Sequence, residues 1–425
     1  MHGEQQFCNS LFYIIARATS AVLALAMVFG LILISTQPAR GQTFKVIYTF
    51  TGGPDGGWPT DTLIMDTAGN LYGTTLIGGS GEGNGAVVKL SKRGSAWVLT
   101  SSYQFQNGAN PYAGVVFGPD GSLYGTTYEG GSGRCGMVFR LAPPTQTPSN
   151  AMNGWTETVL YNFLGGSDGC YPEFGDLIFD QSGNIYGTTA NGGGQSNAGT
   201  VFKLSYSAGA WTESLLHSFT GGSDGGYPIS PVVFDQAGNL YGTTEDGGVY
   251  SQGTVFELTP AGSGWTKKTL YSFQSRNDGA SPYGGLILDR SGNLYGTTEE
   301  GGHLNWGGTF YKLTSSGGSW SETVLYAFTG LAGPMATLVM DAAGNLYGTT
   351  YEDGAYGYGA VFKLSLLDGT WTYTSLYDFA DGNDGGLPAG GVMFDANGNL
   401  YGTASHGGTG SGCDFGCGTV WEITP

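Results

Sequence analysis

The side chains in this sequence that could perform chemistry are carboxylates and histidines in Gly-rich segments. Adjacent acidic pairs follow a G-T-T motif in three successive stretches, and a single glutamate takes the matching place earlier in the chain. Such pairs create a negative field that could attract cations or a basic partner, although solvated surface charge is the simpler interpretation. Two histidines in similar segments could act as bases, but the sequence shows no partner for either. The candidate binding residues are Glu129, Glu245, Asp246, Glu299, Glu300, His303, Glu352, Asp353 and His406.

A second acidic set lies in segments of the form D-G-x-x-P and raises the question of calcium. A ring of carboxylates could coordinate Ca²⁺, which requires several oxygen ligands around one ion. One Asp per segment would leave the carboxylates too far apart to share an ion, and Asp before Gly caps a turn by itself. We therefore expect no cofactor, with Ca²⁺ as the alternative. These aspartates are Asp55, Asp168, Asp224, Asp278 and Asp384.

Four cysteines, Cys135, Cys170, Cys413 and Cys417, lie downstream of the amino-terminal segment. An even number of cysteines in an exported chain indicates disulfides, and four allow three pairings. We favour Cys413–Cys417 within one loop and Cys135–Cys170 between neighbouring loops. Zinc is the alternative, but a C-x-x-x-C spacing without a matching histidine or second close pair is weak evidence for it.

No motif of a known catalytic centre is present in the sequence. It contains no P-loop or H-E-x-x-H, and its two G-x-S-x-G matches, at residues 165–169 and 221–225, lie in loops between predicted strands rather than in the strand–turn–helix of a nucleophile elbow. His217 takes a place where most other repeats carry tyrosine, and we expect it to be packed. We assign no catalytic residue.

A tandem repeat must position these residues. The motif G-N-L-Y-G-T-T or a near copy returns with a period of about 54 residues. Each period contains four short β segments separated by Gly-rich turns. In most periods the first two segments are joined by D-x-x-G-N, which supplies hairpin turn chemistry; in the second period Gly118 replaces the Asp. The motif tyrosines are Tyr72, Tyr124, Tyr186, Tyr241, Tyr295, Tyr347 and Tyr401.

The two ends of the chain favour a closed ring over a solenoid. The last repeat stops after its third strand, whereas the segment after the leader aligns with a fourth strand. We therefore predict an all-β fold, a seven-bladed β-propeller of four-stranded antiparallel blades, in which the N-terminal strand, residues 44–50, completes the last blade. Such closure leaves no sheet edge open to another chain.

The repeated motif is expected to fill the interfaces between blades. Leu71 and Tyr72 should point to opposite neighbours, and Gly73 should leave room for a large side chain. Tryptophans that begin the fourth strands are expected to be core residues rather than ligand platforms.

The amino terminus and the charge restrict location and partners. An apolar run from Ala18 to Ser35 predicts a signal peptide over residues 1–41 and a single propeller domain over 42–425. An uncleaved anchor is the alternative, because about 18 apolar residues approach the length that spans a bilayer. The net charge of −18 disfavours nucleic acid and anionic membranes as partners.

The motif G-N-L-Y-G-T-T, followed by G-G and G-T-V-F-K-L, resembles the GloVer-type (Gloeo/Verruco) tandem repeats of exported bacterial proteins. The resemblance covers the chain downstream of the leader and implies export and surface association. It implies no reaction, so no catalytic residue follows from it. The carboxy-terminal sorting anchor of some relatives is not seen in this sequence.

Our leading hypothesis is an exported, monomeric binding or scaffold protein of the periplasm, cell surface or medium. Its rim loops would bind surface glycans or another exported protein, with no membrane span after signal cleavage. The alternative is a propeller enzyme such as a lactonase or polysaccharide lyase. The first strands read as apolar, which argues against a metal in the channel, but Asp61 and Asp176 near strand starts are candidates for that alternative.

Overall fold

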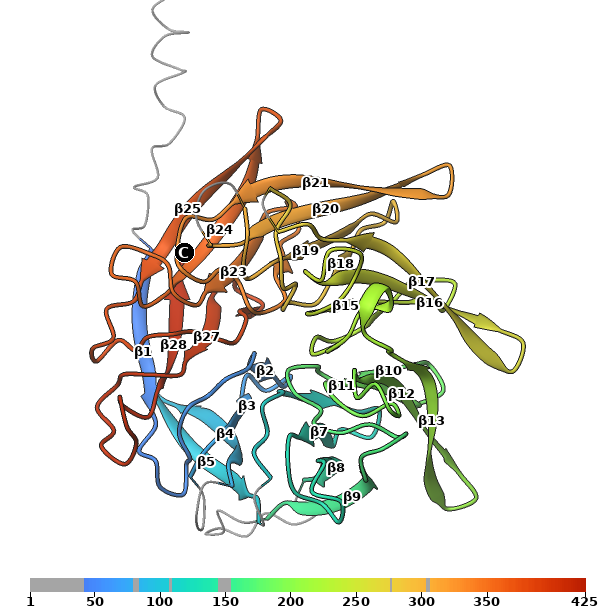
Figure 1. Ribbon diagram of the computed structural model, residues 1–425. Coiled ribbons are helices and arrows are strands. Elements are labelled where there is room, and N and C mark those ends of the chain that lie inside the picture. The colour runs from blue at the N-terminus through green and yellow to red at the C-terminus, as the bar shows by residue number, and fades with distance from the viewer. Residues whose placement is uncertain (1–41, 79–83, 107–108, 144–153, 276, 303–305) are drawn as a thin grey trace, which may run out of the picture. The chain divides into compact units, whose positions relative to one another are not determined.

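The computed structural model describes residues 42–78, 84–106, 109–143, 154–275, 277–302 and 306–425. Phe44–Thr424 forms one compact unit. Within it, seven four-stranded sheets stand in a ring, as Figure 1 shows. The predicted seven-bladed β-propeller is therefore confirmed. The signal peptide prediction falls on residues outside the described part.

In blades 1 to 6 the strands lie side by side in sequence order and neighbouring strands are antiparallel, whereas in blade 7 the first strand of the chain lies beside the last. Blades 1 to 6 comprise β2–β5, β6–β9, β10–β13, β14–β17, β18–β21 and β22–β25, and blade 7 comprises β26–β28 and β1. The first strands are β2 (Ile64–Met65), β6 (Val115–Phe117), β10 (Ile178–Phe179), β14 (Val233–Phe234), β18 (Ile287–Leu288), β22 (Val339–Met340) and β26 (Met393–Phe394). The second strands are β3 (Leu71–Thr75), β7 (Leu123–Thr127), β11 (Ile185–Thr189), β15 (Leu240–Thr244), β19 (Leu294–Thr297), β23 (Leu346–Thr350) and β27 (Leu400–Ala404).

The outer two strands of each blade are longer. The third strands are β4 (Ala86–Arg93), β8 (Met137–Ala142), β12 (Thr200–Ser207), β16 (Thr254–Ala261), β20 (Thr309–Ser316), β24 (Ala360–Leu367) and β28 (Thr419–Thr424). The fourth strands are β5 (Ala96–Gln104), β9 (Thr156–Asn162), β13 (Ala210–Ser218), β17 (Gly264–Ser272), β21 (Ser319–Ala327), β25 (Thr370–Asp378) and β1 (Thr43–Thr49). The described residues include one helical turn, the 3₁₀ segment η1 (Gly222–Asp224), and no helix that could span a membrane.

The amino-terminal strand closes the ring. β1 lies beside β28 as the outer strand of blade 7, and the Phe50 N–H donates to the Gly418 carbonyl at 3.1 Å. The Phe44 ring stacks on Tyr377 of blade 6, with ring centroids 3.5 Å apart. The two ends of the chain thus share one sheet, which the offset repeats predicted.

The core lies between the blades. Leu71 packs with residues of blade 7 such as Tyr401, whereas Tyr72 packs with Val115 and Phe139 of blade 2. The predicted opposite orientations of the motif residues are therefore confirmed. The motif glycine makes room for third-strand side chains: at Gly187, a Cβ would lie 2.7 Å from the Phe202 ring.

The hairpin aspartate fixes the turn and the motif tyrosine together. In blade 3, Asp180 accepts hydrogen bonds from the backbone N–H groups of Ser182 and Asn184, and its other oxygen accepts from the Tyr186 hydroxyl at 3.0 Å. Equivalent bonds occur at Asp66, Asp235, Asp289, Asp341 and Asp395. Turn formation is thus the structural role of this repeated carboxylate.

Candidate functional site

Two sets of loops lie at one end of the blades, and we call this end the loop face. One set joins the second strand of a blade to its third strand, and the other joins the fourth strand to the next blade. Short antiparallel bridges hold the two sets together, for example between Gly226 and Asp246 and between Ala280 and Glu300. All of the predicted binding residues that the structure describes lie in these loops.

The bridges show which acidic residues are equivalent. Asp246, Glu300 and Glu352 each pair with the preceding loop, as His406 does in blade 7. The position before the bridge holds the half-buried Glu245 and Glu299 in blades 4 and 5, but Tyr351 in blade 6. The pair Glu352 and Asp353 is therefore shifted by one residue relative to the other two pairs.

The acidic residues of blades 4 to 6 act on one another electrostatically. Burial raises the pKa of Glu245 to about 7, and the neighbouring carboxylates of Asp246 and Glu299 add to the effect. Burial likewise raises the pKa of Glu299 to about 7, with contributions from Glu300 and Glu352. This arc of the loop face is therefore negative, and part of it holds protons near neutral pH.

The other predicted binding residues are not gathered into one site. His406 is half-buried and its ring stacks on Phe415, with centroids 5.8 Å apart, and lies 6.4 Å from Trp58. Glu129 is exposed in blade 2, away from the acidic arc of blades 4 to 6. His303 lies outside the described residues.

A carboxyl pair lies at the start of the first strands. The Gly114 N–H of blade 2 donates to Asp61 Oδ2 of blade 1 at 2.5 Å and to Asp176 Oδ1 of blade 3 at 2.9 Å. Asp61 Oδ1 also accepts the Thr62 N–H. Glycine at position 114 permits this approach, because a Cβ there would lie 3.0 Å from Asp176 Oδ1.

The two carboxyl groups of this pair titrate together. Burial and the charge of Asp176 raise the pKa of Asp61 well above its ordinary value. Burial also raises the pKa of Asp176 to about 6, although hydrogen bonds from Gly114 and Asp61 act in the opposite direction. The pair therefore retains a proton to a higher pH than isolated carboxyl groups do.

The pair borders a cavity of about 320 Å³ in the centre of the ring. Phe174, Tyr283 and Met335 line it from the loops that enter the blades, and Val116 and Val339 line it from first strands. The expected apolar channel wall is therefore present, with the carboxyl pair set into it. Among the described residues, no group of three or more His, Cys, Asp and Glu side chains converges as metal ligands would.

Five half-buried aromatic side chains lead from the loop face to this cavity, and we call them the aromatic row. The rings of Tyr171 and Tyr128 stack with centroids 4.6 Å apart, and Tyr112 follows 4.9 Å from Tyr128. Phe174 lies 5.5 Å from Tyr112, and Tyr283 lies 5.4 Å from Phe174. The sequence pattern did not predict this row. The sequence feature that could have indicated the row is that the residue after the loop proline is aromatic in only some repeats.

The D-G-x-x-P aspartates join loops to fourth strands. Asp55, Asp168 and Asp384 each accept a backbone N–H four residues earlier and a tyrosine hydroxyl of the preceding strand. In this way one carboxylate caps each loop and anchors the strand before it.

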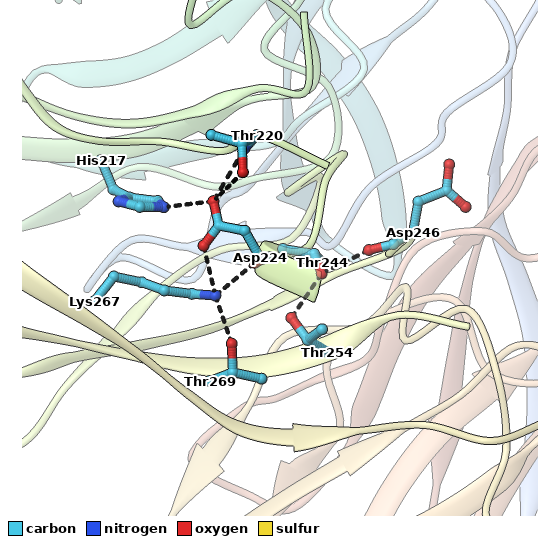
Figure 2. A network of polar contacts seen from close by, with 8 residues as sticks. All are labelled: His217, Thr220, Asp224, Thr244, Asp246, Thr254, Lys267 and Thr269. Atoms are coloured by element: carbon cyan, nitrogen blue, oxygen red, sulfur yellow. Dashed lines mark hydrogen bonds and ion pairs between the residues drawn. The ribbon is translucent and has the colours of Figure 1, made fainter. Parts of the chain in front are cut away.

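Figure 2 shows the variant of this joint between blades 3 and 4. Asp224 accepts the Thr220 N–H, as the other aspartates do, but His217 Nε2 lies 3.1 Å from its Oδ2 in the tyrosine's place. Lys267 of blade 4 places Nζ 3.0 Å from Asp224 Oδ1 and 2.7 Å from Thr269 Oγ1. His217 is thus packed in a structural joint, as expected.

The cysteines add two covalent links to the loop face. Disulfides join Cys135 to Cys170, between blades 2 and 3, and Cys413 to Cys417, within blade 7. These are the two pairings that the sequence favoured. The first link lies beside Tyr171 and so adjoins the outer end of the aromatic row.

Comparison with known proteins identifies the repeat family of this chain. The model of the Gloeobacter/Verrucomicrobia repeat matches residues 30–175, 147–337 and 307–425. A xyloglucanase of Paenibacillus sp is 26% identical over 240 residues, covering 49% of this chain and 22% of that protein. The chain therefore spans about a fifth of the length of that relative.

The solved structures that match this chain are distant in sequence. A putative 6-phosphogluconolactonase from Bacteroides uniformis is 14% identical, with a TM-score of 0.47 over 74% of this chain and 83% of that one. A surface component of the type-IX secretion system of Porphyromonas gingivalis is 16% identical, with a TM-score of 0.47 over 87% of this chain and 47% of that one.

Proposed function

The chain belongs to the Gloeobacter/Verrucomicrobia repeat family, and from this premise we propose that it is an exported binding propeller whose loop face holds a neutral glycan. The proposal includes no catalytic step. The observation that carries it is the aromatic row, which ends at the mouth of the central cavity.

The chemistry of the row suits a sugar chain. The C–H faces of pyranose rings pack on aromatic rings, whose faces carry negative charge density. Tyrosine hydroxyls and carboxylates beside the row can hydrogen-bond sugar hydroxyls. Small-ligand pockets typically combine an apolar wall with a few polar groups, as this cavity does.

The charge around the mouth favours neutral glycans over anionic ones. Burial raises the pKa of the Tyr283 hydroxyl, and the carboxylates of Glu245, Glu173 and Glu299 raise it further. Their negative field, together with the net charge of −18, would repel uronates and sulfated chains. The similarity to a xyloglucanase makes xyloglucan the first polysaccharide to test.

Affinity electrophoresis and calorimetry with xyloglucan, mixed-linkage β-glucan, galactomannan and polygalacturonate test this function. We expect at least one neutral polymer to bind and polygalacturonate not to bind. Tyr171→Ala and Tyr128→Ala should each weaken binding about tenfold, on the scale of one lost aromatic contact. The control is Tyr206→Ala, an exposed tyrosine at the far end of β12. If no neutral polymer binds, or if the three variants behave alike, the proposal is wrong.

Another exported protein is the alternative occupant of the loop face. The exposed side chains of Trp306, Leu331, Tyr356 and Phe415 lie in loops of this face and could contact a protein surface. A protein partner should be released by substitutions at these residues and should be indifferent to Tyr171→Ala, which distinguishes it from a glycan.

The carboxyl pair supports a second candidate function, hydrolysis of a neutral ester or lactone. Asp176 would accept a proton from a water molecule while the oxygen of that water bonds to the carbonyl carbon of the substrate. Protonated Asp61 would then give its proton to the departing alkoxide. The products would be an acid and an alcohol, or one hydroxy acid. A lyase acting on uronates fits less well because the mouth is negative. Turnover of δ-gluconolactone or of an acetyl ester that is lost in both Asp61→Asn and Asp176→Asn would support the enzyme.

A further inference from the structure

We propose that the central cavity is a subsite for the terminal sugar of a neutral glycan chain, held by Asp61 and Asp176 and covered by Phe174 and Tyr283. This inference rests on the proposed function and adds to it that the protein binds the end of the glycan rather than a segment along its length.

The size of the cavity sets the number of sugar units. Small-ligand pockets commonly measure roughly 300–1,000 Å³, and this cavity, at about 320 Å³, lies at the lower limit. It has room for one sugar ring and little more. Val116 and Val339 of the first strands line the cavity below the loops. The terminal sugar of the glycan would therefore stop there, and the rest of the glycan would lie on the aromatic row.

The lining matches a ring with hydroxyl groups. Phe174 and Tyr283 supply aromatic surface at the mouth, 5.4 Å apart between centroids. Asp61 and Asp176 both face the Gly114 N–H, and each carboxyl group retains lone pairs that can accept from a hydroxyl. A pair that holds one proton also donates, and hydroxyl groups need both a donor and an acceptor.

The same pair explains selectivity for a neutral end. A sugar carboxylate in this cavity would lie beside two carboxyl groups in a poorly hydrated site, with no cation among the residues that line it. Burial of an unpaired charge is costly, so uronate ends should be rejected even where the rest of the chain fits the loop face.

Counting chain ends tests the inference. Calorimetric titrations would use xyloglucan, or whichever neutral polymer of the panel binds most tightly, before and after partial endo-hydrolysis, at equal sugar mass. If the protein holds ends, the number of sites per gram rises in proportion to the reducing ends created. Stoichiometry that instead follows total mass overturns the inference and leaves glycan binding on the loop face intact. No binding of either form overturns both.

Variants locate the subsite. Ala389→Trp should fill the cavity from a loop while both carboxyl groups stay in the chain, and it should weaken binding of a digested fragment at least tenfold. Asp61→Asn should do the same, while Tyr206→Ala should leave binding unchanged. The folded state of each variant is checked by its melting temperature. If Ala389→Trp is folded and binds fragments as the unchanged protein does, the cavity is not the subsite.

Discussion

At the scale of single residues, one position of the fourth strand decides the chemistry of the joints that blades 3, 4 and 5 make with the preceding loops. Lys267 faces Asp224 with its ammonium group, whereas Glu213 and Glu322 occupy the corresponding places and face Asp168 and Asp278. Burial, followed by the charge of Asp278, raises the pKa of Glu322 to about 7. One joint is thus an ion pair, and two joints place carboxyl groups against each other.

The substitution Glu322→Lys should convert the blade 4–5 joint into the Lys267 type. We expect the free energy of unfolding to rise by about 1 kcal/mol at pH 8, because a repulsive pair becomes an attractive one. At pH 5 the gain should shrink, since Glu322 is then protonated and no longer repels Asp278. Denaturant unfolding at both pH values measures this difference.

The control for that substitution is Thr323→Lys, which places the same ammonium group at an exposed neighbour on β21 and raises the net charge by one, where Glu322→Lys raises it by two at pH 8. It should change stability little at either pH. A gain from Thr323→Lys of half that from Glu322→Lys, or more, would mean that net charge, and not the joint, is responsible.

At the scale of the element, glycine in the second strand sets how closely the strands of a blade pack. Gly187 lies opposite Phe202 in the register of β11 and β12. A Cβ there would meet the Phe202 ring at 2.7 Å and the Leu177 side chain at 3.0 Å. The motif therefore requires glycine for space rather than for backbone conformation.

Gly187→Ala should lower the free energy of unfolding by about 1–3 kcal/mol, the usual cost of overpacking a core. A double variant that also carries Phe202→Leu, which introduces a smaller side chain, should recover part of this loss. Gly264→Ala is the control, because no atom lies within 4 Å of its added Cβ. Thermal unfolding of the three variants measures the effect, and equal losses at Gly187 and Gly264 would contradict the steric explanation.

At the scale of the whole molecule, two classes of carboxyl group give stability opposite dependences on pH. Burial raises the pKa of Glu213, Glu245, Glu299 and Glu322 from 4.5 to about 7. The folded state then binds protons more tightly than the unfolded state, so the free energy of unfolding falls as pH rises between these values. Burial alone would also raise the pKa of the hairpin aspartates, such as Asp180, but their hydrogen bonds lower it.

We therefore expect stability to be greatest at mildly acidic pH. Between pH 5 and 8 the free energy of unfolding should fall by about 2 kcal/mol, a figure that allows for solvent screening of half-exposed groups. Below about pH 4 it should fall again as the hairpin aspartates are protonated. Urea titrations from pH 3 to 9 measure the curve.

The double variant Glu213→Gln, Glu322→Gln provides the internal control for the pH dependence. It removes two groups whose protonation is linked to folding, so the decline between pH 5 and 8 should become shallower. A decline of unchanged slope would show that these joints do not contribute.

The sequence by itself determined the ring. Four-stranded blades are specified locally by seven copies of one motif, by alternating apolar residues and by D-x-x-G-N turns. The fourth strand of the last blade lies at the amino terminus, so it can pair with that blade only if the ring closes. Local propensity and pattern repeat in each blade, so each copy supports the same interpretation.

Only the tertiary structure decided which residues meet. Asp61 and Asp176 lie in blades 1 and 3, and they converge because Gly114 between them has no side chain. The aromatic row draws on loops of several blades in the same way, and the acidic pairs proved to differ in register by one residue. Pattern along a chain fixes what each element is, but distances across the ring depend on packing between elements, which no single repeat contains.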